Sequence, residues 1–168
     1  HIHKFDVKKT GFRSNKAQTE NYYSRQIRTL TKVYHKQRED AGPIVGLEKM
    51  ILELEKISSS LPKSFQCLIH GDYKLDNFIF HPTEPRVVAV LDWELSTIGH
   101  PSADLTSLLA AYFVRSDFFP KRLQHLNPTF NGFEDKCLAD FSLPSFDQMI
   151  QYYSDLSVED PNEMLKNF

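Results

Sequence analysis

The stretch "IHGDYKLDNFIF", residues 69–80, places two acidic residues, a lysine and a carboxamide between two short apolar runs. Asp72 precedes Asn77 by five positions, and a later apolar run, "RVVAVLDW", contains a further acid, Asp92. Short runs rich in Val, Ile and Phe, joined here by the Pro-bearing turn "HPTEPR", are typical of paired β-strands. If the run "FIF" and the run "RVVAV" form a hairpin, the side chains of Asp72, Asn77 and Asp92 meet at one end of it.

This set of side chains suits one kind of chemistry. Phosphoryl transfer from a nucleotide needs a carboxylate that orients the acceptor hydroxyl, together with hard oxygen ligands for Mg²⁺. Asp72, Asn77 and Asp92 supply oxygen atoms of both kinds. Asp and Asn also favour turns for purely structural reasons, so the spacing alone leaves that explanation open.

Helical periodicity surrounds the predicted hairpin. An apolar stripe over residues 16–38 predicts one amphipathic helix, and a second stripe runs from Leu47 to Ile57 after the break "EDAGPIVG". Further helices are predicted over residues 102–114 and, from a Ser cap, over 145–156, while "QCLI" predicts a third short strand. No other stretch carries a strand signal of comparable strength. The pattern predicts an α+β, mostly helical fold in which a small β-hairpin carries the site.

Composition limits the classes of function. The 168 residues, 40% of them hydrophobic, are enough to bury the core of one domain. A formal net charge of −2 provides no field that attracts nucleic acid, and no apolar run approaches the roughly 18 residues of a membrane span. The two cysteines, Cys67 and Cys137, form neither a disulfide framework nor a zinc pattern. We expect an intracellular protein, cytoplasmic first, with a mitochondrial or peroxisomal location left open.

Two motifs together resemble a known family. "HGDYKLDN" followed by "VLDWE" is similar to the catalytic loop and metal-binding segment of aminoglycoside-phosphotransferase-like small-molecule kinases, distant relatives of protein kinases. The same loop matches the protein-kinase pattern H-R-D-x-x-x-x-N, with Gly in place of Arg. The run from "HGDYKLDNFIFHP" to "VVAVLDWELSTIGHPSADL" especially resembles the kinase-like domain associated with acyl-CoA dehydrogenases. The resemblance implies a protein-kinase-like C-lobe with ATP and Mg²⁺ as cofactors.

The resemblance also implies roles for the central residues. Asp72 is expected to be the catalytic base that orients the acceptor hydroxyl. Asn77 and Asp92 are expected to bind Mg²⁺ and, through it, the nucleotide. Lys74 is either a catalytic contact to the γ-phosphate of the nucleotide or a solvated surface lysine, and the sequence leaves both interpretations open.

Other residues are expected to support the site. By the same resemblance His70 packs and hydrogen-bonds under the loop, and Asp104 accepts backbone N–H groups of the loop. Glu94 is either a second acid near the metal or a local structural hydrogen bond. Trp93 is expected in the core. His100 stands in "GHP" where many relatives have "GDP".

The resemblance predicts the domain organisation. No Gly-rich loop and no strand-borne Lys precede "HIHKFD", and "VEDPNEMLKNF" lacks an amphipathic continuation. Residues 1–168 are therefore expected to be the C-lobe of a kinase-like phosphotransferase domain. The ATP-covering N-lobe and the final helices are expected to be missing from the chain, and an acyl-CoA dehydrogenase is expected as a partner or fused domain.

The predicted function is ATP- and Mg²⁺-dependent phosphorylation of a hydroxyl group on a small molecule, with the isolated chain inactive. For the acceptor, the resemblance implies a hydroxyacyl group, as in a CoA thioester. Arg115, Lys121 and Arg122 lie beside several Phe and fit an anionic, partly apolar acceptor, although an ordinary packed connection is equally open. An aminoglycoside, choline or homoserine kinase is the alternative, and a catalytically silent kinase-like binding module is the third hypothesis.

Overall fold

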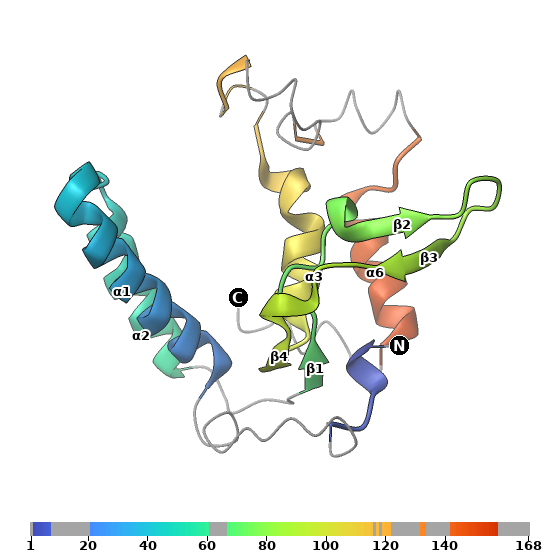
Figure 1. Ribbon diagram of the computed structural model, residues 1–168, viewed down its shortest axis with the longest axis horizontal. Coiled ribbons are helices and arrows are strands. Elements are labelled where there is room, and N and C mark those ends of the chain that lie inside the picture. Colours follow the sequence, from blue (N-terminus) through green and yellow to red (C-terminus); the bar gives the residue numbers. More distant parts are fainter. Residues whose placement is uncertain are drawn as a thin grey trace.

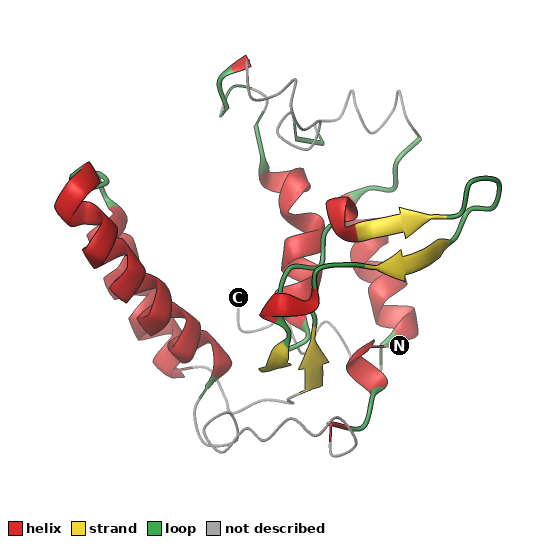
Figure 2. Cartoon of the chain, viewed as in Figure 1, coloured by secondary structure: helices red, strands yellow, loops and turns green. Residues whose placement is uncertain are grey.

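The computed structural model describes residues 2–7, 21–60, 67–115, 117, 119–121, 132–133 and 142–157, drawn in colour in Figures 1 and 2. The helices are α1 (Tyr22–Ala41), α2 (Leu47–Ser60), α3 (Ser102–Leu109) and α6 (Phe146–Leu156). The strands are β1 (Cys67–Ile69), β2 (Phe78–Phe80), β3 (Val87–Val90) and β4 (Thr97–Gly99). Short 3-10 turns are η1 (Ile2–Lys4), η3 (Leu75–Asn77), η4 (Trp93–Leu95) and η5 (Ala110–Phe113). The predicted α+β class is confirmed.

Two small antiparallel sheets lie at the centre of the molecule. β2 and β3 form the predicted hairpin, with Phe78 opposite Val90. β1 pairs instead with β4, so that Cys67 lies opposite Gly99. No strand was predicted at β4, because its three residues are too few to show an alternating pattern and their partner strand lies about thirty positions earlier.

The core lies where this second sheet meets α3. Its buried apolar side chains come from β1, β4 and α3, and they are Cys67, Ile69, Ile98, Leu105 and Leu109. His70 and Asp104 are buried among them, at 0% and 1% relative exposure. Because a buried polar group is costly unless it is hydrogen-bonded, these two side chains must have partners inside the fold.

Helices α1 and α2 pack against each other as a hairpin. α1 joins the sheets near its first turns, where the Arg25 guanidinium donates to the carbonyl oxygen of Ile98 (2.9 Å), and Figure 1 shows the far ends of both helices standing away from the sheets. Apolar residues of the predicted stripes are consequently exposed there, among them Leu30 at 64% and Met50 at 56%. Helical periodicity predicted both helices, although α1 begins at Tyr22 and residues 16–20 of the prediction lie outside the described residues. The described part of the chain gives the apolar faces of these helices little core to cover.

The remaining helices follow the sequence pattern closely. α6 begins at the predicted cap, where Ser145 and Gln148 exchange side-chain-to-backbone hydrogen bonds as a capping box. The helix predicted over residues 102–114 is α-helical through α3 and continues as the 3-10 turn η5. No helix in the described ranges is long and apolar enough to cross a membrane.

Candidate active site

The loop between β1 and β2 is anchored by the ring of His70. Its Nδ1 accepts the N–H of Asp72 (3.2 Å), and its Nε2 lies 2.8 Å from the carbonyl oxygen of Leu91. Since a carbonyl only accepts, Nε2 carries the proton and the ring is neutral. His70 therefore ties the loop that bears Asp72 to the segment that bears Asp92, the residue after Leu91.

Asn77 makes the second connection between these segments. Its backbone oxygen accepts the N–H of Leu91 (2.8 Å), and its side-chain Nδ2 donates to the Asp72 carbonyl oxygen (2.8 Å) and to Asp72 Oδ2 (3.1 Å). The side chain is therefore fixed by its nitrogen, and in the described part of the chain no donor occupies Oδ1. That oxygen is available as a ligand for a hard cation.

Lys74 and Asp72 form an ion pair at the mouth of the loop. Lys74 Nζ lies 2.8 Å from Asp72 Oδ2, and both side chains are partly exposed. The hydrogen bond from Lys74 lowers the pKa of the Asp72 carboxyl below its usual value, and the same bond raises the pKa of Lys74. Asp72 is consequently ionised and only weakly basic at neutral pH, a state better suited to orienting a hydroxyl than to removing its proton early.

Asp92 begins the turn η4 in an unusual backbone conformation. Its φ of 68° and ψ of 52° are left-handed, which is uncommon for a residue other than Gly. The carboxylate is exposed, and its negative charge adds to the raised pKa of Lys74. Non-Gly residues in this region cluster at functional sites.

The two residues after Asp92, Trp93 and Glu94, both lie on the surface of the turn. Trp93 was expected in the core, but its side chain lies 42% exposed. The turn at η4 places its ring 4.7 Å from the ring of His70 between centroids, and its indole N–H donates to the carbonyl oxygen of Val90 (2.7 Å). Trp93 therefore covers the loop anchor from outside. Glu94 is exposed on the same turn.

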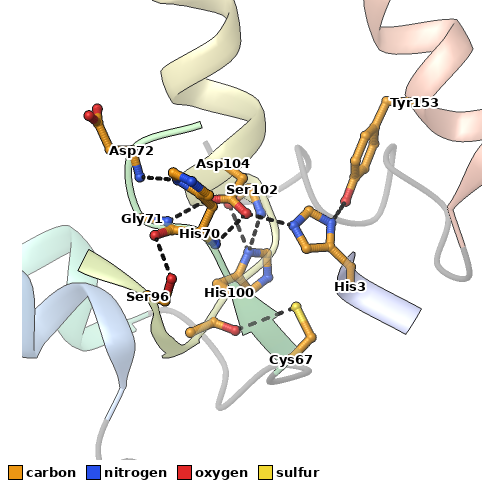
Figure 3. A network of polar contacts seen from close by, with 11 residues as sticks. His3, Cys67, His70, Gly71, Asp72, Ser96, His100, Ser102, Asp104 and Tyr153 are labelled. Carbon is orange, nitrogen blue, oxygen red and sulfur yellow. Dashed lines mark hydrogen bonds and ion pairs between the residues drawn. The ribbon is translucent and has the colours of Figure 1, made fainter. Parts of the chain in front are cut away.

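Asp104, in the first turn of α3, lies beneath the loop (Figure 3). Its Oδ2 accepts the N–H of His70 (2.8 Å) and its Oδ1 accepts the N–H of Gly71 (2.8 Å). This is the arrangement that the resemblance implied. Sequence reasoning missed His3, whose Nε2 lies 3.0 Å from Asp104 Oδ2, because nothing local marks a partner 101 positions away.

The arrangement so far is a carboxylate, a carboxamide and a lysine gathered on a braced loop, with a second carboxylate on the adjoining turn. Residues 1–132 match the phosphotransferase enzyme family. The chain belongs to this family. The expected resemblance to aminoglycoside-phosphotransferase-like proteins is confirmed, and with it the kinase-like character of the fold.

Individual members of the family show the same relationship. A crystal structure of a Ralstonia eutropha protein assigned as an aminoglycoside phosphotransferase superposes with a TM-score of 0.67 at 29% identity, covering 92% of this chain and 43% of that one. Acyl-CoA dehydrogenase family member 11 of Rattus norvegicus is 38% identical over 149 residues, 88% of this chain and 17% of the relative. Family member 10 of Mus musculus is 35% identical over 153 residues, 90% of this chain and 13% of the relative. The chain thus spans less than a fifth of these two relatives.

His100 lies just before the start of α3. Its Nδ1 lies 2.7 Å from Ser102 Oγ and accepts the N–H of Ser102 (3.3 Å), the first residue of the helix. Burial lowers the pKa of His100, and the charge of His3 lowers it further. The lowered pKa favours the neutral imidazole, whose Nδ1 can accept this N–H.

The residues expected to bind metal form a small donor set. In the described ranges no group of three His, Cys, Asp or Glu side chains could hold a metal ion. Mg²⁺ in nucleotide sites characteristically uses one or two protein oxygens and completes its shell with water and phosphate. Asn77 Oδ1 and the Asp92 carboxylate fit such a site, and they do not fit an all-protein cage.

The basic residues expected near the acceptor are only partly described. Arg115 pairs with Asp117 through two short hydrogen bonds, of 2.9 Å and 2.6 Å, on the surface. Lys121 is exposed, and Arg122 lies outside the described residues, as does Cys137.

Proposed function

We propose that this chain is the acceptor-side lobe of an ATP- and Mg²⁺-dependent kinase that phosphorylates a hydroxyl group of a small molecule. The observation that carries the proposal is the position of the Asp72 carboxylate, which touches both the Asn77 amide and the Lys74 ammonium. The Asp72 carboxylate thus lies between Asn77, which can offer an oxygen ligand to a metal ion, and Lys74, whose positive charge suits a phosphate group.

In the proposed reaction Asp72 accepts a hydrogen bond from the acceptor hydroxyl and aims its oxygen at the γ-phosphorus. The new oxygen–phosphorus bond forms as the bond between the γ-phosphorus and the ADP oxygen breaks, and the hydroxyl proton passes to Asp72. Lys74, already 2.8 Å from Asp72, offsets negative charge on the transferred group. Asn77 and Asp92 would hold Mg²⁺, whose chemistry is to neutralise charge on the nucleotide phosphates.

We further propose that residues outside this chain complete the nucleotide cleft as an N-lobe. The superposed crystal structure supports this, because the present chain covers only 43% of it. In kinase-like enzymes a second lobe covers the phosphates and adds a further lysine. The chain alone is then expected to fold without measurable turnover.

For the acceptor we propose a hydroxyacyl compound of the CoA-thioester type. The support is the similarity to proteins named as acyl-CoA dehydrogenase family members, which suggests that the kinase-like domain works beside acyl-CoA chemistry. An aminoglycoside-type acceptor is the second candidate, since the superposed structure is assigned to an aminoglycoside phosphotransferase.

The test is Asp72→Asn in a protein that joins this chain to its N-lobe, with ADP release measured across hydroxyacyl thioesters, aminoglycosides and amino alcohols. We expect kcat to fall about 10²–10⁴-fold, with nucleotide affinity retained. Asp76→Asn is the matched control, since it makes the same change on an exposed acid of the same loop. If Asp72→Asn stays within a few-fold of the parent, the assignment fails. An inactive parent on the whole panel favours a silent binding module.

A further inference from the structure

A histidine far from the catalytic loop in sequence contacts the acid that braces it. We propose that His3 is a positioning residue for the catalytic loop: its imidazole holds the Asp104 carboxylate in the orientation that clamps the amides of His70 and Gly71 (Figure 3). The consequence for turnover rests on the proposed function, whereas the consequence for the loop itself does not.

The buried carboxylate of Asp104 has a third donor besides the two loop amides. The carboxylate is 1% exposed, and a buried charge is costly unless its oxygens are hydrogen-bonded. Two of its donors are loop amides, which cannot fix the acid independently because they are the groups being held. In the described part of the chain the donating side chain is His3, whose Nε2 lies 3.0 Å from Asp104 Oδ2. His3 therefore contacts the same Asp104 oxygen that accepts the His70 amide, and it comes from a different element, η1.

His3 is itself oriented by Tyr153 of α6. Its Nδ1 lies 3.0 Å from the Tyr153 hydroxyl, and the two rings meet edge to face with centroids 6.0 Å apart. A carboxylate can only accept, so the Nε2 of His3 donates the hydrogen bond to Asp104. His3 therefore connects Tyr153 of α6 to Asp104 through its two ring nitrogens.

Asp104 is linked to Asp72, the proposed catalytic residue, through Gly71 and through His70. Asp104 holds the N–H of Gly71, the residue before Asp72, and it holds the N–H of His70, whose ring accepts the N–H of Asp72. Within the described residues the side chain of His3 hydrogen-bonds to Asp104 and Tyr153 and not to Asp72 or the proposed metal ligands, so its effect on them passes through Asp104. A shift of the Asp104 carboxylate would alter the aim of Asp72 without removing any group that binds nucleotide.

The experiment compares His3→Leu, His3→Gln and Tyr153→Phe with the control His35→Leu, which alters an exposed histidine on α1. The first readout is amide hydrogen exchange of this chain followed by NMR. In His3→Leu we expect the His70 and Gly71 amides to exchange about 10–100-fold faster than in the parent, because a hydrogen bond to a buried charge is lost. The Ile98 amide in the core is expected to change far less. His3→Gln should restore part of the protection, since its amide can donate, and Tyr153→Phe should give a smaller loss.

The second readout is turnover in the protein that includes the N-lobe, where His3→Leu should lower kcat about tenfold with little change in the KM for ATP. In an Asp104→Asn background His3→Leu should add nothing further. The inference is overturned if His3→Leu speeds the exchange of the loop amides no more than it speeds that of the Ile98 amide, or if His3→Gln is as damaging as His3→Leu. If His3→Leu does not fold, Tyr153→Phe decides the question by the same comparison. Because exchange needs no catalysis, it can support this inference even where the proposed kinase activity fails.

Discussion

Substituting Gly71 with alanine should both destabilise the fold and displace the turn that carries Asp92. Gly71 has a φ of +87°, a value that residues with a Cβ rarely adopt, and this strain costs about 1–2 kcal/mol. An added Cβ would also fall inside contact distance of the Leu95 carbonyl oxygen and 3.0 Å from the Leu95 carbonyl carbon. Overpacking of this kind costs about 1–3 kcal/mol. The expected loss in free energy of unfolding is therefore about 2–5 kcal/mol.

Gly46→Ala separates the two contributions. Gly46 has a similar φ of +83°, but a Cβ there meets nothing within 4 Å. It should lose about 1–2 kcal/mol, from backbone strain alone. By thermal unfolding, a chain of this size shifts by about 2–4 °C per kcal/mol, so we expect a fall of about 4–20 °C for Gly71→Ala and about 2–8 °C for Gly46→Ala. Equal shifts for the two variants would refute the argument that the close approach of Leu95 matters.

Three further results are expected. Asp92→Ala should weaken ADP binding in the presence of Mg²⁺ more than in its absence, as judged by calorimetric titration, and equal losses would contradict a role in binding metal. The lowered pKa of His100 means that the unfolded chain binds the proton more readily, so the stability contributed by its neutral ring is complete above about pH 6.5 and is lost as the pH falls below it. Urea unfolding from pH 8 to pH 5 should show this slope in the parent and a shallower one in His100→Asn, and parallel curves would argue against it. Ser145→Ala should cost about 1 kcal/mol by removing the cap of α6, and an unchanged melting temperature would mean that the capping box contributes little.

The parts of the fold that the sequence predicted are those with local causes. The β2–β3 hairpin and the helix α6 follow from strand residues around a turn and from a Ser cap before an apolar stripe. The contact between Asp72 and Asn77 is local too, because the single turn η3 brings positions five apart together.

The missed features have causes that lie elsewhere in the chain. β4 exists because β1 pairs with it, and His3 joins the site only through the tertiary fold. Trp93 is apolar enough for a core, but the left-handed backbone of Asp92 turns it onto the surface, and no pattern of residue types signals that turn. The stripes of α1 and α2 predicted helices correctly and burial poorly, since periodicity shows which face is apolar and cannot show what packs against it.

Segments that are far apart in the sequence meet at Asp104, and this affects the order in which the chain folds. The hydrogen bonds that join His3 to Asp104 and to Tyr153 span 101 and 150 positions, whereas the β2–β3 hairpin closes over about a dozen. Contacts of long sequence separation form late, because closing a long loop costs entropy before any contact is gained. On a ribosome, the hairpin can form while the part of the chain that contains Tyr153 is still unsynthesised, several seconds away. The loop is then expected to acquire its final shape only after α6 has docked, so a nascent or truncated chain would carry every residue of the site and still not align them.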